Sequence, residues 1–371
     1  MSDPTSPAGP PAEISHLVRE RVEARARRDW THADAIKAQI EAAGWRVVDR
    51  RGRSSVSQAA PASVEADGEI RYGTAAGVPS LLDAPATTAW TVAVVASESP
   101  DRVSRLLTAL RTHAPAGTQV VIVANDPSDA QVLALLPDAA DRAPIGGLTP
   151  ELLRTSARLG HAAALNIALR RASGELVLIA DGMAWPSGDA ISPLAIALKD
   201  PAVAVAGGFG LYAPDDEPFR PNALGREPGT DHAAAAAAPT ALEGAWLAFR
   251  RADYIELGPL DEHFATPSWL DVWWSLRLRA GAEPEGWEIT EPSDEAEAGE
   301  PGNATDAGER DDLAYEDSSE AEFEFPKPRL ALRADLPLER EAAGWPPDRS
   351  RLNRRNMYRV LDRFGRRMDL A

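Results

Sequence analysis

The chain opens with a helical pattern of apolar positions. In EISHLVRERVEARARR they recur every three or four residues, which predicts a helix with one buried face. HADAIKAQIEAAG repeats the pattern, with Asp29 or Thr31 placed to cap this second helix and Gly44 placed to end it. WRVVD follows as a short strand, so a compact helical hairpin is expected. The apolar residues expected inside it are Ile14, Leu17, Val18, Val22, Ala33, Ile36, Ile40 and Ala43.

From Thr91 the pattern alternates between strands and helices. TVAVVAS, QVVIVAND, ELVLIAD and VAVAGGFGLY are predicted strands, and PDRVSRLLTALRTH, HAAALNIALRRASG and DAISPLAIALKD are predicted helices between them. Continuous apolar strands that alternate with helices predict an α/β fold, with a mostly parallel sheet covered by helices on both faces. Ligands of such sheets bind at the carboxyl ends of the strands. The polar residues expected at that edge are Ser97, Glu98, Asn125, Asp126 and Asp181.

Composition sets the expected boundaries. Residues 54–88 are rich in Ala, Ser, Pro and Gly, which is typical of a linker. The expected order is a disordered leader at 1–12, the helical hairpin at 13–53, the linker at 54–88, the α/β domain at 89–282, an acidic disordered insertion at 283–326, and a strand with a basic helix at 327–371 that completes the α/β domain.

Charge and cysteine content exclude several classes. Residues 283–326 hold 17 acidic side chains and one arginine, so most of the net charge of −18 lies in one block. Such a block repels itself, which favours a solvated spacer over a functional acidic arm. The chain has no cysteine, so disulfides, thiolate zinc sites and cysteine nucleophiles are excluded. It shows neither a signal-peptide pattern nor an apolar run of membrane-spanning length, and a cytoplasmic protein is expected.

The motifs, taken in order, resemble the family 2 glycosyltransferases, which have the GT-A fold. The resemblance covers residues 91–282 and extends to 327–371. It rests on PDRVSRLLTAL, QVVIVANDPSD, LGHAAALNIALRRASGELVLIAD, EGAWLAFRRADYIELGPLDEHF and SWLDVWWSLRLRAG. It implies transfer of a hexosyl group from a nucleotide-sugar donor to an acceptor hydroxyl with inversion. Whether the acceptor is a glycan, a lipid-linked molecule or a protein stays open.

The resemblance and the strand ends together select the candidate site residues. The donor-binding candidates are Ser97, Glu98, Asn125, Asp126, Gly160, His161, Asn166 and Asp181, and the acceptor-binding candidates are Glu243, Gly244 and Trp274. Each has a plainer alternative: turn residues for Asn125 and Asp126, a capping or surface residue for His161, a solvated charge for Glu243, and core packing for Trp274.

Two carboxylates carry the expected chemistry. Asp271 is the candidate base that takes the acceptor proton; the alternative is a helix-start residue stabilised by the helix dipole. Asp181 is the candidate ligand for Mg²⁺ or Mn²⁺, which the resemblance implies. The family carries a second Asp where this chain has Met183, and a thioether does not bind a hard cation usefully. Asp181 as a turn cap is the alternative, and Asp189 is a further candidate ligand if its loop folds back.

Residues 14–53 resemble a different family, the C-terminal anticodon-region segment of cysteinyl-tRNA synthetases. The match rests on Arg28-Asp29-Trp30, Ala33-Asp34, Ile36-Lys37 and Val47-Val48-Asp49. A docking or spacer module is favoured over tRNA contact. The basic terminal helix, with Arg354, Arg355 and Arg359, leaves phosphate closure, peripheral membrane binding or a solvated face open. Two rival functions therefore remain: a catalytically degenerate GT-A module that binds nucleotide or glycan, and an RNA-associated adaptor.

Overall fold

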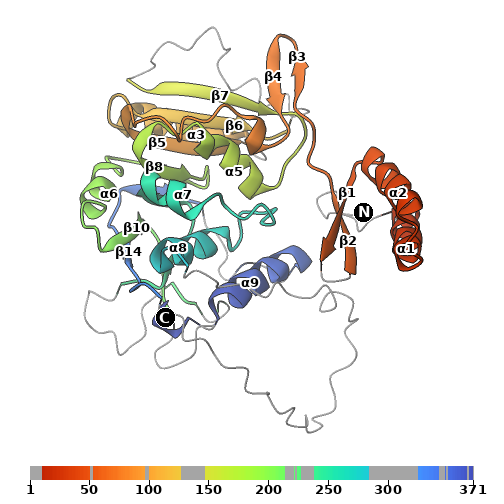
Figure 1. The fold of residues 1–371 in the computed structure, drawn as a ribbon. Coiled ribbons are helices and arrows are strands. Elements are labelled where there is room, and N and C mark those ends of the chain that lie inside the picture. Colours follow the sequence, from red (N-terminus) through yellow and green to blue (C-terminus); the bar gives the residue numbers. More distant parts are fainter. Residues whose placement is uncertain are drawn as a thin grey trace.

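The computed structural model of the chain has a nine-stranded sheet at its centre (Figure 1). The structure describes residues 11–50, 53–96, 100–126, 147–213, 221, 224–226, 238–283, 325–341, 347, 350–365 and 367–370. The strand order is β14 (Leu330–Arg333), β10 (Val203–Gly207), β13 (Trp246–Arg250), β8 (Gly174–Ala180), β5 (Thr88–Ala96), β6 (Gln119–Ala124), β7 (Thr149–Thr155), β4 (Glu69–Tyr72) and β3 (Val64–Ala66).

Most strands of this sheet are parallel. Only β13, inserted between β10 and β8, and the terminal strand β3 run against their neighbours. The central strands are buried on both faces, as all six residues of β6 show. Continuous apolar strands form in this way because helices cover both sides.

The helices form two layers, each with its own apolar cluster. On one face lie α3 (Pro100–His113) and α6 (Ser192–Ala197). On the other lie α5 (His161–Arg170), α7 (Arg251–Leu257), α8 (Leu270–Ala280) and α9 (Arg351–Phe364). The predicted α/β class, with a mostly parallel sheet, helices on both faces and a preceding helical hairpin, is confirmed.

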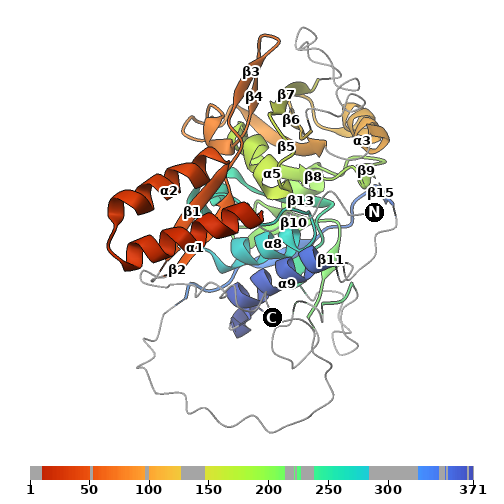
Figure 2. The same cartoon turned by 90° about the vertical axis from the view of Figure 1, so that its right-hand side faces the viewer.

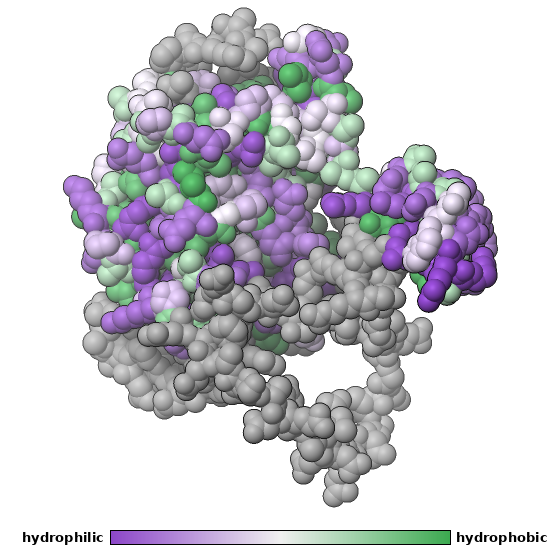
Figure 3. Space-filling model, in the orientation of Figure 1, coloured by the Kyte–Doolittle hydropathy of each residue, from purple (hydrophilic) through white to green (hydrophobic). Residues whose placement is uncertain are grey.

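The helical hairpin forms a unit with its own small core. It contains α1 (Ala12–Ala26), α2 (Trp30–Ala42) and the paired strands β1 (Trp45–Arg50) and β2 (Arg53–Gln58). Figure 1 shows it beside the sheet, and its visible face in Figure 3 is mostly hydrophilic. The carboxylate of Asp29 accepts a hydrogen bond from the His32 N–H at 3.1 Å, which confirms the predicted cap. Whether this unit contacts RNA stays a prediction.

Two apolar positions predicted inside the hairpin are wrong. The side chain of Val22 is 42% exposed, and Ala43 lies on the surface beyond the end of α2. Arg21 and Ala24 are buried in α1 instead. Helix α1 lies alongside α2 (Figure 2), and its inward face includes Ala24 together with Ile14, Leu17 and Val18.

The predicted linker at 54–88 is wrong in part, because short strands form within it. It contains β2, β3, β4, the short helix η1 (Ala75–Gly77) and the first residue of β5. β4 pairs with β7, through Arg71 opposite Arg154 and Tyr72 opposite Thr155. Strands of three or four residues are too short to show a hydrophobic period in the sequence. Pairing with a neighbouring strand stabilises them.

Parts of the sequence-based organisation lie outside the described residues. They are the predicted leader apart from Pro11 and Ala12, and the predicted acidic insertion apart from Glu283, Phe325 and Pro326. Within the described ranges, no helix has the length and apolar character needed to cross a membrane.

Candidate functional site

Asp181 stands at the carboxyl end of β8, at the sheet edge predicted for ligand binding. Its backbone N–H donates to the Ala245 carbonyl at 2.9 Å, and its Oδ1 accepts from the Met183 N–H at 2.9 Å. Burial raises the pKa of this carboxyl, against the lowering effect of the Met183 hydrogen bond and of Arg102. One carboxylate oxygen of Asp181 therefore caps the turn that follows β8, as expected from the alternative in which Asp181 is a turn cap.

Asp271 lies in the first turn of α8 and is bonded to the same stretch of chain. Its Oδ2 accepts from the Gly244 N–H at 2.6 Å, and its Oδ1 accepts from the Val272 N–H at 2.8 Å. Because Gly244 and Ala245 are adjacent, one dipeptide connects Asp271 to Asp181. Each oxygen of Asp271 keeps a lone pair for a further proton donor.

The environment of Asp271 suits proton transfer near neutral pH. Burial raises the pKa of its carboxyl to about 7, and the negative charge of Glu243 adds to the rise. The two backbone hydrogen bonds oppose this shift, since they favour the charged form. The helix dipole alone would lower the pKa, so stabilisation of a helix start does not account for this carboxyl.

Asp271 lies so close to position 244 that only glycine fits there. A Cβ atom at position 244 would lie 2.6 Å from the Asp271 Cβ and 2.9 Å from its Oδ2. We therefore expect Gly244→Ala to push Asp271 out of place and to lower turnover about a hundredfold, because displacements of about 1 Å have effects of that size. Steady-state kinetics on the variant check this. Thermal melting checks that the variant is folded. A folded Gly244→Ala variant with wild-type activity would contradict this account of the site.

Glu243 is nearly buried and is held by two arginines. Arg226 donates to both of its oxygens, at 2.9 and 2.7 Å, and Arg340 donates to Oε1 at 3.1 Å. The guanidinium of Arg340 also stacks over the Phe209 ring, 4.2 Å from its centroid. The solvated-charge alternative is thus wrong for Glu243. The role of Glu243 and Gly244 toward an acceptor stays a prediction.

The start of α8 is held in a strained conformation by the C-terminal helix. Trp269, just before α8, is buried and has a left-handed backbone with φ of 70°, a conformation that costs about 1–2 kcal/mol for a residue with a side chain. Asn356 of α9 donates to the Ser268 carbonyl at 3.0 Å and to the Thr266 hydroxyl at 3.1 Å. The C-terminal helix thus supports the loop that places Asp271.

Two asparagines predicted to bind the donor hold loops of the chain in this structure. The amide of Asn125 is buried and bonds both the N–H and the carbonyl of Leu159, at 2.9 Å each. The amide of Asn166 is buried and bonds the N–H and the carbonyl of Leu260, also at 2.9 Å. Because these amides already hold loops of the chain, a structural role is favoured, and donor binding by Asn125 and Asn166 stays a prediction.

Gly160 and His161 begin α5, but the helix start faces another loop. The N–H of His161 donates to the Ala265 carbonyl at 2.9 Å, and that of Ala162 donates to the Phe264 carbonyl at 3.1 Å. A Cβ at Gly160 would lie 3.2 Å from the Ala265 Cα, so glycine allows this close approach. The first N–H groups of the helix are therefore used within the chain, and a donor contact by the side chain of His161 stays a prediction.

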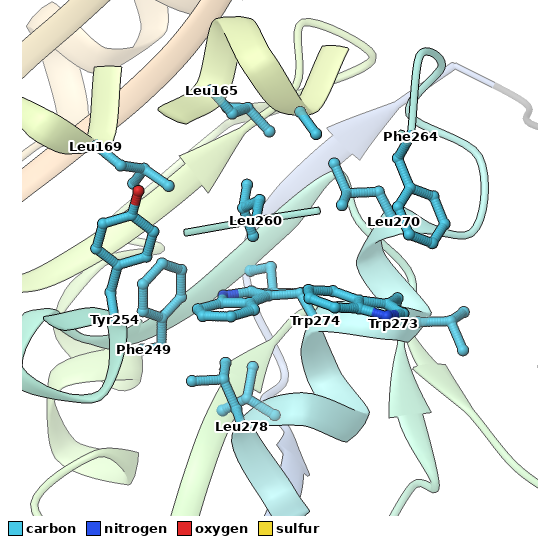
Figure 4. Packing of buried hydrophobic residues seen from close by; sticks show 14 of the residues in the cluster. Leu165, Leu169, Phe249, Tyr254, Leu260, Phe264, Leu270, Trp273, Trp274 and Leu278 are labelled. Atoms are coloured by element: carbon cyan, nitrogen blue, oxygen red, sulfur yellow. The ribbon is translucent and has the colours of Figure 1, made fainter. Parts of the chain in front are cut away.

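Trp274 is a core residue, which corrects its predicted place in the acceptor site. Only 1% of it is exposed. Its ring stacks on Trp273 at 6.1 Å and meets Phe249 and Tyr254 edge-on at 5.5 and 5.9 Å between centroids. Figure 4 shows the indole enclosed by these rings and by leucines from α5 and α8. At this position on α8 the side chain faces the sheet, so no sugar can reach it.

The remaining candidates add little to the site. Asp126 follows β6 at the same sheet edge as Asp181. Ser97 and Glu98 lie outside the described residues. Asp189 accepts hydrogen bonds from the Ile191 and Ser192 N–H groups at 3.2 and 3.0 Å, so it caps the start of α6 and does not help Asp181.

The residues present do not fit a carboxylate-held Mg²⁺ or Mn²⁺ ion. Such ions take several oxygen ligands, whereas Asp181 has one oxygen in a turn and Met183 offers only sulfur. The carboxylate of Glu341, whose backbone N–H donates to the Met183 carbonyl, is bound by Arg102 at 2.6 Å and by Arg105 at 3.2 Å. No group of three or more His, Cys, Asp or Glu side chains suited to a metal occurs in the described part of the chain.

Sequence reasoning missed the arginines around these carboxylates. Arg102 and Arg105 stand one helical turn apart in α3, directly after the first strand of the domain. That spacing was a readable signal, because it puts two cations on one helix face. Glu341 and Arg340 gave no signal, since they lie more than 150 residues from Met183 in sequence.

A family model matches the centre of the chain. Residues 91–255 match the family model of glycosyl transferase family 2. No curated protein matches the chain.

Three solved structures illustrate the likeness. GalNAc-T7 with UDP, GalNAc and Mn²⁺ is 16% identical with a TM-score of 0.41, over 52% of this chain and 41% of that one. PcManGT, a mannosyltransferase from Pyrobaculum calidifontis in complex with GDP-Man and Mn²⁺, is 22% identical with a TM-score of 0.39, over 55% of each chain. S. aureus TarS 1-349 with UDP is 16% identical with a TM-score of 0.38, over 51% and 54%. The chain thus matches about half of the length of these proteins.

Proposed function

We propose that this chain is an inverting glycosyltransferase that moves a hexosyl group from a nucleotide-sugar donor to an acceptor hydroxyl. The observation that carries the proposal is Asp271: a carboxyl with a pKa of about 7, fixed by the Gly244 and Val272 N–H groups at the strand-end rim. The family match over residues 91–255 supports the reaction class. The donor occupies the rim beside Asp181, at the carboxyl ends of β5, β6 and β8.

The reaction in this proposal is a direct displacement. The acceptor oxygen attacks the anomeric carbon as Asp271 takes its proton, the new carbon–oxygen bond forms, and the bond to the donor phosphate breaks with its electron pair leaving on the nucleoside diphosphate. A base within hydrogen-bond reach contributes about 10²–10⁴-fold to such a rate. Rigid hydrogen bonds to both oxygens keep Asp271 aligned without reorganisation in the transition state.

The pH dependence of turnover follows from the pKa of Asp271. The base must be ionised, and burial raises its pKa to about 7. Below that pH the carboxyl is protonated, so kcat/KM is expected to fall by about tenfold per pH unit on the acid side and to level off above pH 7. Rates between pH 5 and 9 check this; a rate that stays flat down to pH 5 would contradict an Asp271 base.

Nucleotide release from UDP-, GDP- and dTDP-hexoses tests the proposed function. The expected result is turnover of one donor class. Calorimetry on the same samples measures donor binding separately. Absence of both turnover and binding for all three classes would contradict the proposal.

A degenerate module that binds a nucleotide or a glycan without turnover is the second candidate. Met183 in place of the second carboxylate, and the turn-bound oxygen of Asp181, favour it. Donor binding in the calorimeter with no nucleotide release, even with mixed glycan and lipid-linked acceptors, would select this reading.

A further inference from the structure

We propose that Arg102 and Arg105 form a diphosphate-binding pair that works without a metal ion, and that the carboxylate of Glu341 occupies this pair as an internal anion when no donor is bound. The inference rests on the proposed function in one respect: the diphosphate is taken to be that of a nucleotide-sugar donor.

Glu341 is held as a phosphate group would be held. Arg102 donates from Nε to Oε2 at 2.9 Å and approaches the same oxygen with a terminal nitrogen at 2.6 Å. Arg105 donates from a terminal nitrogen to Oε1 at 3.2 Å. Two guanidinium groups thus share the two oxygens of one anion. Arginine suits this role because its planar group presents paired donors to carboxylate and phosphate alike.

The pair lies where the family's second carboxylate is missing. Strand β15 (Leu338–Arg340) runs antiparallel to β9 (Ala184–Pro186), and the next residue, Glu341, donates its N–H to the Met183 carbonyl at 2.9 Å. A Cβ at Gly182 would lie 3.0 Å from the Arg102 Cβ, so the turn after Asp181 packs directly on α3. Arg102 and Glu341 both influence the Asp181 carboxyl electrostatically.

The pair is accessible and held in position. The side chains of Arg102, Arg105 and Glu341 are 40%, 43% and 31% exposed, so an incoming anion can exchange with Glu341. The guanidinium of Arg105 lies over the Trp185 ring, 4.3 Å from its centroid, which fixes its direction. Two positive charges at this edge would neutralise a leaving diphosphate. They would replace a metal ion in this task, since the residues around Asp181 do not fit one.

Calorimetric titration of the full chain with inorganic pyrophosphate and with UDP, in the presence of EDTA, tests the proposal. Binding is expected without metal. Arg102→Gln and Arg105→Gln are each expected to weaken it by about tenfold or more, because each loses a charged hydrogen bond. Glu341→Gln is expected to tighten it by about tenfold, because the competing anion is removed. Thermal melting verifies that each variant is folded, and Arg102→Lys, which keeps the charge but loses the fork, is expected to fall between wild type and Arg102→Gln.

Two control substitutions remove an exposed charge away from the pair. Arg111→Gln lies at the exposed end of α3, and Glu175→Gln lies at the opposite end of β8 from Asp181; neither is expected to change binding. Pyrophosphate binding that requires Mn²⁺, or a Glu341→Gln variant that binds no more tightly than wild type, would overturn the proposal. Because pyrophosphate carries no sugar, its binding can follow these expectations while every donor fails to turn over, in which case the proposed function fails and this site stands.

Discussion

Asp271→Asn is expected to lower the rate of sugar transfer by about a thousandfold while leaving donor affinity within about twofold. The amide of asparagine has nearly the same shape, but it cannot take the proton of the acceptor hydroxyl, and its NH2 group cannot accept one of the two backbone hydrogen bonds that hold Asp271. In the proposed reaction the loss falls on kcat, because the carboxylate acts on the acceptor in the transition state, whereas the donor binds at the Asp181 side of the rim. Steady-state rates and calorimetry on one preparation separate the two effects.

Asp200→Asn is the matched control for this substitution. Asp200 lies on the surface, where its carboxylate accepts from the Ala202 N–H at 2.8 Å, so its loss should leave kcat unchanged. Asp271→Asn with a rate within about threefold of wild type would exclude general-base catalysis by this residue.

Trp274→Ala is expected to destabilise the fold by about 3–5 kcal/mol. The indole is almost completely buried and touches three other aromatic rings, so alanine would leave a large cavity between α8 and the sheet. The midpoint of urea unfolding measures the loss, with an unchanged slope showing that the same surface is exposed on unfolding.

Trp274→Phe separates packing from the polar edge of the indole. The Trp274 Nε1 atom is buried without a hydrogen-bond partner among the described residues, so phenylalanine removes an unsatisfied donor as well as volume. A loss smaller than that of Trp274→Ala is expected. If Trp274→Ala kept wild-type stability but bound acceptor more weakly, Trp274 would be a surface residue of the acceptor site and the packing account would fail.

The strongest elements of the fold were predictable from local pattern. The helix expected over PDRVSRLLTALRTH has the same ends in the structure, Pro100 and His113, because its apolar residues repeat at helical spacing and a proline starts it. Strand β6 was also identified, since it is apolar throughout. By contrast β7 was missed: TPELLRT begins with Thr-Pro and alternates with charged residues, and it is a strand because β6 and β4 pair with it on both sides.

Only those site residues were predictable whose role follows from their position at the end of a strand or the start of a helix. Asp181 follows a buried strand and Asp271 starts a helix, and the structure connects both to Gly244–Ala245. Asn125 and Asn166 occupy similar positions in the pattern, but their partners are Leu159 and Leu260, which no local rule identifies. Glu341 depends on the pairing of β15 with β9, a contact between distant segments that a sequence pattern does not encode.

The stereochemistry of donor hydrolysis tests the central claim, direct displacement with Asp271 as base, without knowledge of the acceptor. Water replaces the acceptor hydroxyl, and proton NMR follows the first sugar released from an α-linked nucleotide hexose before the anomers interconvert. The β-anomer is predicted to appear first, at a rate that falls in Asp271→Asn. Initial release of the α-anomer would contradict the account. It would mean that the configuration at the anomeric carbon is retained, whereas a single direct displacement inverts it.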